Sequence, residues 1–141
     1  MDSYVMDASV GVKWLFDETM SEIALKLEAS LQKGEIKILV PELFFCEIAN
    51  VCWQKRKRKM TSWEGAVNGF DRIVELPLKC ISDREVAALA LENALIYGVS
   101  VYDSFYLSLA EIYTAPLITA DEALYKTCHK KFDFIEYLGN L

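Results

Sequence analysis

The sequence predicts one α/β domain of three layers, in which a central parallel sheet of four to five strands is flanked by helices. Short apolar runs alternate along the chain with longer segments of helical period, a pattern typical of βα units. The chain has no low-complexity segment, internal repeat or linker rich in Pro and Gly. Because 141 residues suit one domain with a buried core, we expect residues 1–141 to fold as one unit.

The first half of the chain is expected to hold two strands and four helices. Two of these helices carry a capping-box signature, in which Thr19 and Thr61 each precede a Glu by three residues. Gly34 is a typical helix stop, and Pro41 suits a first helical turn because its missing N–H would lack a partner there. The predicted strands are 4–6 and 36–40, and the predicted helices are 9–16, 19–33, 42–59 and 61–74.

The second half is expected to hold three strands and three helices. Ser82 and Thr119 precede Glu85 and Glu122 at the capping-box spacing, and Gly98 ends a helix. The predicted strands are 78–81, 116–119 and 134–138, and the predicted helices are 82–98, 103–113 and 122–128.

Composition limits the possible functions. The net charge of −6 argues against general affinity for nucleic acid, and a hydrophobic share of 53% suggests that some apolar surface lies in an interface. No apolar run could span a bilayer and the start of the chain is unlike a signal peptide, so we expect a cytoplasmic protein. The four Cys form no C-x-x-C pair and are expected to be buried thiols.

Four acidic residues stand at positions that the predicted fold would bring together. Asp7, Asp103 and Asp121 each follow an apolar run and lie where a helix begins, and Glu47 lies in the second turn of the helix after the strand 36–40. Ligands of open parallel α/β sheets bind beyond the carboxyl ends of the strands. We therefore expect the four carboxylates at one edge of the sheet.

Helix capping is the alternative explanation for each Asp, because an Asp before a helix commonly accepts free backbone N–H bonds. The capping boxes weigh against it: with Thr119 as the cap, Asp121 falls inside the first turn, and neither Asp7 nor Asp103 completes a box. Glu47 lies within a helix among apolar residues and cannot be a cap. The set of four is therefore harder to explain by capping than any single member.

A cluster of carboxylates indicates a metal site. Adjacent carboxylates repel one another unless protons or cations balance them. A site of oxygen ligands without His or Cys favours Mg²⁺ or Mn²⁺, and such ions bind substrate phosphate and activate water. Without the four acids the net charge would be −2, so the acidity of the chain belongs partly to the predicted site.

These residues and their neighbours resemble the PIN-domain family, and in particular the VapC-like toxins of toxin–antitoxin pairs. The similarity covers essentially the whole chain in order and spacing. The matching segments are Met6-Asp7-Ala8-Ser9-Val10 with Lys13-Trp14 beyond it, Pro41-Glu42-Leu43, Glu47-Ile48-Ala49-Asn50, Val101-Tyr102-Asp103-Ser104-Phe105-Tyr106 and Leu117-Ile118-Thr119-Ala120-Asp121.

The resemblance implies a three-layer PIN-like fold and an Mg²⁺- or Mn²⁺-dependent endoribonuclease that leaves a 5′-phosphate. It implies that Asp7, Glu47, Asp103 and Asp121 are the catalytic metal ligands. It also implies that Ser9, Asn50 and Thr119 are the polar neighbours that orient them. The expected partners are RNA, a small antitoxin and a second copy of the chain in a homodimer.

Two basic features are candidates for contact with RNA phosphate. Lys13 is close enough to Asp7 along the chain to be a candidate for binding RNA phosphate. The run Lys55–Lys59 is equally well explained as a solvated helix end that complements the helix dipole or as a phosphate contact.

Other classes of protein fit the residues less well. A phosphatase of the haloacid dehalogenase type needs a second Asp at the position of Ser9, and a dinucleotide-binding domain needs G-x-G-x-x-G after the first strand. The hypothesis that stays open is a catalytically silent PIN-like module that binds RNA or protein.

Overall fold

The computed structural model describes residues 1–141 and contains five strands, seven α-helices and a terminal 3₁₀ helix. The strands are β1 (Asp2–Met6), β2 (Ile36–Pro41), β3 (Lys79–Ile81), β4 (Leu117–Thr119) and β5 (Ile135–Tyr137). The helices are α1 (Ala8–Leu15), α2 (Ser21–Gln32), α3 (Leu43–Lys57), α4 (Trp63–Glu75), α5 (Asp83–Tyr97), α6 (Val101–Tyr113), α7 (Glu122–Cys128) and η1 (Leu138–Asn140).

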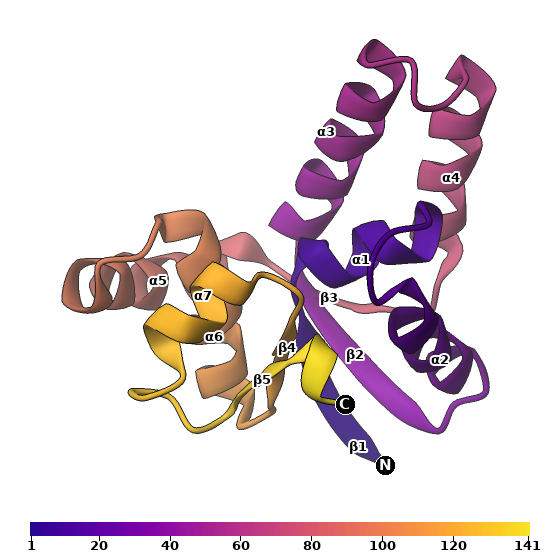
Figure 1. The fold of residues 1–141 in the computed structure, drawn as a ribbon. Coiled ribbons are helices and arrows are strands. Elements are labelled where there is room, and N and C mark those ends of the chain that lie inside the picture. The colour runs from indigo at the N-terminus through magenta and orange to yellow at the C-terminus, as the bar shows by residue number, and fades with distance from the viewer.

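The five strands form one parallel sheet in the order β3-β2-β1-β4-β5, which confirms the predicted fold class. The first strand is central, and the chain winds outward from it in both directions. Helices α1 and α2 contact one part of the sheet, α6 contacts its three central strands, and α5 packs on α6. Helices α3 and α4 form an arm that projects beyond the sheet (Figure 1). No helix is both long enough and apolar enough to cross a membrane.

All predicted strands and helices are present, but both predicted caps in the first half of the chain are wrong. Helix α2 has Met20 as its N-cap, with a left-handed φ of 70°, and no side chain accepts a bond there. Helix α4 is capped by Ser62, one residue after Thr61, through a bond from the backbone N–H of Gly65. The capping-box spacing located both helix starts, yet it did not identify the side chain that faces the free N–H groups.

A close approach between α1 and α3 places two of the acidic residues. The backbone of Gly11 lies so near Phe44 and Ile48 that a Cβ there would be 2.8 Å from the Phe44 ring. Only glycine fits such an approach without displacing its neighbours. The two helices therefore pack together just beyond the positions of Asp7 and Glu47.

The cysteine prediction holds for only half of the residues. Cys52 and Cys128 are buried, whereas Cys46 and Cys80 are exposed. Cys46 lies on a face of α3 that turns outward, and Cys80 lies in the edge strand β3, which is paired on one side only. Both are free, solvent-exposed thiols.

An ion pair between a buried glutamate and a half-exposed arginine ties α4 to the helices beside the sheet. Glu28 in α2 is 3% exposed, and one of its oxygens accepts from the Arg72 guanidinium of α4 and from the Gln32 amide. The second nitrogen of Arg72 donates to the backbone carbonyl of Trp14 at 2.7 Å. The other Glu28 oxygen has no hydrogen-bond partner, so the arginine is the main compensation for this buried charge.

We predict that Arg72→Met lowers the free energy of unfolding by about 2 kcal/mol, because it leaves the Glu28 carboxylate buried without its cation. Denaturant unfolding followed by circular dichroism measures the change. The control is Arg84→Met, which removes an exposed arginine with no ion pair and should cost less than about 0.5 kcal/mol. Equal losses in the two variants would contradict this role of the ion pair.

Candidate active site

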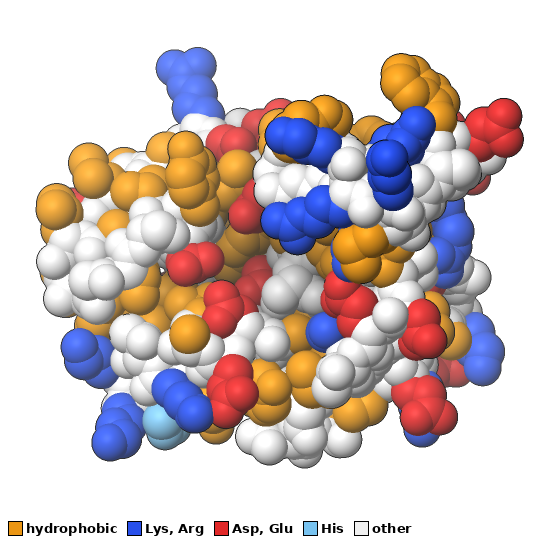
Figure 2. Space-filling model, turned by 45° about the horizontal axis from the view of Figure 1, so that its top comes forward, with side chains coloured by type: hydrophobic (Ala, Val, Ile, Leu, Met, Phe, Trp, Pro, Cys, Tyr) orange, Lys and Arg blue, Asp and Glu red, His pale blue; other side chains and the backbone are white.

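The four predicted acids lie around the carboxyl ends of the three central strands. Asp7 follows β1, Asp121 follows β4, Glu47 lies in the second turn of α3 after β2, and Asp103 lies in the first turn of α6. The strand order reverses direction at β1 and β4, which is where ligands of parallel α/β sheets bind. Figure 2 shows this face as a hollow bordered by acidic side chains, with Lys and Arg side chains gathered above it.

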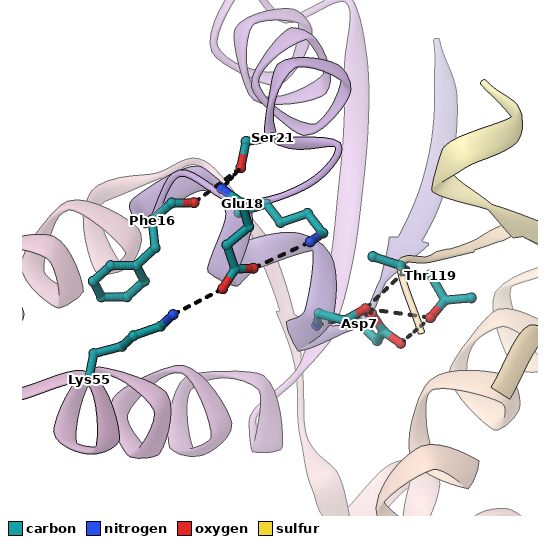
Figure 3. A network of polar contacts seen from close by, with 9 residues as sticks. Asp7, Phe16, Glu18, Ser21, Lys55 and Thr119 are labelled. Atoms are coloured by element: carbon teal, nitrogen blue, oxygen red, sulfur yellow. Dashed lines mark hydrogen bonds and ion pairs between the residues drawn. The ribbon is translucent and has the colours of Figure 1, made fainter. Parts of the chain in front are cut away.

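Asp7 is the fixed point of the site. Its side chain is 6% exposed and caps α1 by accepting from the backbone N–H of Ser9 at 3.1 Å. The Ser9 hydroxyl donates to the same oxygen, and the Thr119 hydroxyl of β4 donates to the other oxygen at 2.6 Å (Figure 3). Ser9 and Thr119 thus orient the Asp7 carboxylate from both sides.

The same two hydroxyls fix the loop that carries the fourth acid. Ser9 Oγ accepts from the backbone N–H of Ala120 at 2.9 Å, and Thr119 Oγ1 accepts from that of Asp121 at 3.0 Å. Because each hydroxyl donates to Asp7 and accepts from this loop, the ends of β1 and β4 are held in one network.

Burial makes Asp7 reluctant to ionise. Loss of solvent raises its pKa, the hydrogen bonds from Ser9 and Thr119 lower it, and the charges of Asp103 and Asp121 raise it again. The balance puts the pKa of Asp7 at about 6, against 3.8 for an ordinary Asp. A bound cation would relieve this cost.

Glu47 is half-buried and held by a residue that sequence reasoning missed. The hydroxyl of Tyr106, which is 2% exposed in α6, donates to a Glu47 oxygen at 2.5 Å. Burial raises the pKa of Glu47, the Tyr106 hydrogen bond lowers it, and the charge of Asp103 raises it. Tyr106 stands three residues after Asp103, a helical spacing that puts both on one face and could have identified it.

Asp103 is coupled by charge to all three of the other acids. Burial raises its own pKa, and so does the charge of Asp121. Its charge in turn raises the pKa of Asp7 and of Glu47. It is not a cap, since Ser100 caps α6 by accepting from the Asp103 backbone N–H at 3.0 Å.

Two of the acids do cap helices, which corrects the comparison with the capping boxes. Asp121, not Thr119, is the N-cap of α7 and accepts from the backbone N–H of Leu124 at 3.1 Å. Thr119 is still within β4, paired with Tyr137 of β5, and its hydroxyl faces Asp7. Asp7 and Asp121 therefore combine capping with membership of the acidic cluster, because capping uses only one oxygen of each carboxylate.

Two further predicted site residues lie at its margin. Asn50 is exposed on α3 and takes no part in the side-chain hydrogen bonds around the acids, so its orienting role stays a prediction. Lys13 is mostly buried and forms an ion pair with Glu18 at 3.3 Å, and it contacts none of the four predicted site acids.

The donor chemistry of the site fits Mg²⁺ or Mn²⁺, because every candidate ligand is a carboxylate oxygen and the carboxylates raise one another's pKa values. No three of these side chains converge closely enough to hold an ion as they stand. Asp7 is fixed by its hydrogen bonds, whereas Glu47 and Asp103 are partly exposed on helices. Ion binding would therefore require these side chains to turn towards Asp7.

Comparison with known proteins adds independent information. The PIN domain family matches residues 4–130. The chain is 34% identical over 122 residues to Ribonuclease VapC3 of Pyrobaculum aerophilum, covering 85% of this chain and 90% of that protein.

Solved structures show the same fold. A Pyrobaculum aerophilum protein, PAE2754, superposes with a TM-score of 0.72 at 20% identity over 99% of this chain and 85% of that chain. VapBC2 of Rickettsia felis, solved bound to a DNA fragment from its promoter, gives 0.63 at 14% identity over 96% and 98%.

We predict that Asp103→Asn raises the melting temperature of the metal-free protein by a few degrees at pH 7.5, because it removes the charge that acts on Asp7 and Glu47. The raised pKa values mean that the folded chain binds protons more readily than the unfolded chain. The folded protein should therefore become more stable as the pH falls, and for Asp7 this gain occurs between pH values of about 6 and 3.8. Because the carboxylates are then partly protonated, the stabilisation by Asp103→Asn should be smaller at low pH.

Differential scanning calorimetry in a chelating buffer at pH 7.5 and pH 5 measures both effects. Asp133→Asn, at an exposed position outside the cluster, is the matched control. An Asp103→Asn variant that melts at or below the wild-type temperature at both pH values would show that repulsion between the site carboxylates does not destabilise the folded protein.

Proposed function

Because this chain belongs to the PIN-domain family, we propose that it is an Mg²⁺- or Mn²⁺-dependent endoribonuclease and the toxin component of a toxin–antitoxin pair. The observation that carries the proposal is the set of four carboxylates at one sheet edge, with the pKa of buried Asp7 raised to about 6. A protein with no cation to bind would gain stability by losing these charges. The kinship with a ribonuclease supports RNA as the substrate.

The chain's own residues would act as follows. Asp7 and Asp103 are the proposed direct metal ligands, and Glu47 and Asp121 complete the ligand set. Ser9 and Thr119 keep both Asp7 oxygens oriented, and Tyr106 does the same for one oxygen of Glu47. The chemistry that a divalent ion supplies when bound is a lowered pKa of coordinated water and neutralised charge on the phosphate.

A small antitoxin is the proposed protein partner, supported by the structural similarity to a toxin–antitoxin complex. The arm formed by α3 and α4 offers it an apolar cavity of about 290 Å³. Trp53 and Trp63 line the cavity and are 58% and 72% exposed, and its two charged lining residues are Arg56 and Asp71. An antitoxin segment that presents apolar side chains would suit this surface.

A homodimer is proposed as well. Helices α5 and α6 expose several large apolar side chains that a second copy could cover, namely Leu91, Leu95, Ile96, Val101, Tyr102 and Ile112. Contiguous apolar side chains on a surface commonly mark a protein interface.

The alternative function is a catalytically silent PIN-like module that binds RNA or protein. Such a module has no reason to keep four carboxylates that repel one another. Titration calorimetry with Mn²⁺ separates the two proposals, since the silent module need not bind the ion.

We predict that Asp7→Asn and Asp103→Asn each reduce Mn²⁺-dependent RNA cleavage by at least about a hundredfold, since each removes a charged ligand from the site. Gel analysis of RNA cleavage with and without chelator measures the loss, and circular dichroism verifies the fold. Asp133→Asn should cleave at the wild-type rate.

Two results would refute the assignment. One is wild-type activity in both site variants, and the other is cleavage by the wild type that survives removal of divalent ions.

A further inference from the structure

Two lysines from different helices meet at one carboxylate beside the acidic site. Lys13 of α1 and Lys55 of α3 lie 3.3 Å and 3.1 Å from the two oxygens of Glu18, which stands in the loop between α1 and α2 (Figure 3). The lysine side chains are only 11% and 17% exposed, and that of Glu18 is 30% exposed. Two partly desolvated cations therefore share a single anion.

The loop holds Glu18 in place. Its backbone N–H donates to the Ser21 hydroxyl at 2.9 Å, and that hydroxyl donates to the Phe16 carbonyl at 3.1 Å. The Phe16 ring in turn lies under the Lys55 ammonium at 5.2 Å. The loop closes through Met20 with a φ of 70°, a conformation that costs a non-glycine residue energy. These bonds fix the loop that carries Glu18 between α1 and α2.

The lysine pair lies on the same two helices that position Asp7 and Glu47. Helix α1 begins at Asp7 and α3 carries Glu47, and the two helices pack together at Gly11. Lys13 is about 9 Å along α1 from Asp7, and Lys55 is about 12 Å along α3 from Glu47. An RNA strand with its scissile phosphate at the acids, if it runs along these two helices, would reach the lysines within a few nucleotides.

An RNA strand that enters this site meets negative charge, which the two lysines would offset. The chain carries a net charge of −6, and its acids surround the site that RNA must enter. Burial would raise the pKa of Glu18, but the hydrogen bonds and charges of Lys55 and Lys13 outweigh burial and lower it, so Glu18 is ionised at neutral pH. Its carboxylate occupies the position where a phosphate would contact both ammonium groups.

We propose that Lys13 and Lys55 form a subsite for an RNA phosphate next to the cleavage site, and that Glu18 holds this subsite in the free protein until the phosphate displaces it. The inference rests on the proposed ribonuclease function and extends it to substrate positioning. It also assigns Lys55 a role apart from the rest of the basic run, whose Lys57 lies over Trp53. The competing explanation is that Glu18 only clamps α1 to α3.

The test compares Glu18→Gln with Glu22→Gln. Both changes remove one negative charge within a few residues of each other, but Glu22 is exposed on α2 and contacts no lysine. Binding of a short single-stranded RNA of mixed sequence is measured by fluorescence anisotropy in the Asp103→Asn background, which keeps the RNA intact. KM and kcat for the same RNA are measured with Mn²⁺ in the Asp103 protein.

We expect Glu18→Gln to tighten RNA binding and lower KM by about threefold or more, with kcat nearly unchanged and a steeper dependence of binding on salt. Lys13→Met and Lys55→Met should weaken binding, and combining both with Glu18→Gln should abolish its gain. Glu22→Gln should bind as the parent protein does.

If Glu18 only clamps the two helices, these variants should melt at lower temperatures but bind RNA as tightly as the control does. That result would overturn the subsite. So would a failure of the parent protein to bind RNA at all. Absence of wild-type cleavage, with the expected order of affinities preserved, would refute the ribonuclease but not the subsite.

Discussion

The structure of the site depends on one buried carboxylate that three elements share. Asp7 directly follows β1, caps α1 and accepts a hydrogen bond from the Thr119 hydroxyl of β4. Its hydrogen bonds therefore determine where the central strands end and where the first helix begins. Glu47 and Asp103 lie on helices packed against the same strands, so their positions follow from how α3 and α6 rest on the sheet. Asp7 is thus the fixed carboxylate around which the other three acids are arranged.

This arrangement has an electrostatic cost that the rest of the fold must offset. Burial and neighbouring charges raise the pKa of three of the acids, which means that the ionised site destabilises the empty protein. Elsewhere buried charge is compensated directly, as Arg72 compensates Glu28 and as Lys13 and Lys55 compensate Glu18. The acidic cluster is the exception, and an uncompensated cluster at the edge of a parallel sheet is typical of a binding site.

Sequence reasoning succeeded where the information was local or periodic. Alternating apolar runs predicted the five strands in order, and the spacing of the four acids placed them at one edge. It failed where a side chain had to choose between two partners. Thr119 matched a cap by spacing, but its hydroxyl is directed at Asp7, and Asp121 caps α7 instead. Tyr106 was not identified because a tyrosine in a helix resembles a core residue, and only its spacing from Asp103 hinted that it reaches Glu47.

The sequence by itself determined the order of the elements, the identity of the acids and the oxygen-only chemistry of the site, because hydrophobic period and residue type are carried by the chain. Only the tertiary structure decided which hydroxyl bonds to which carboxylate. It also brought Lys13 and Lys55 together at Glu18, although Lys55 lies 37 positions after Glu18 in the chain. These contacts join elements that are distant in the chain. Their geometry comes from helix packing, such as the close approach at Gly11, which no local pattern specifies.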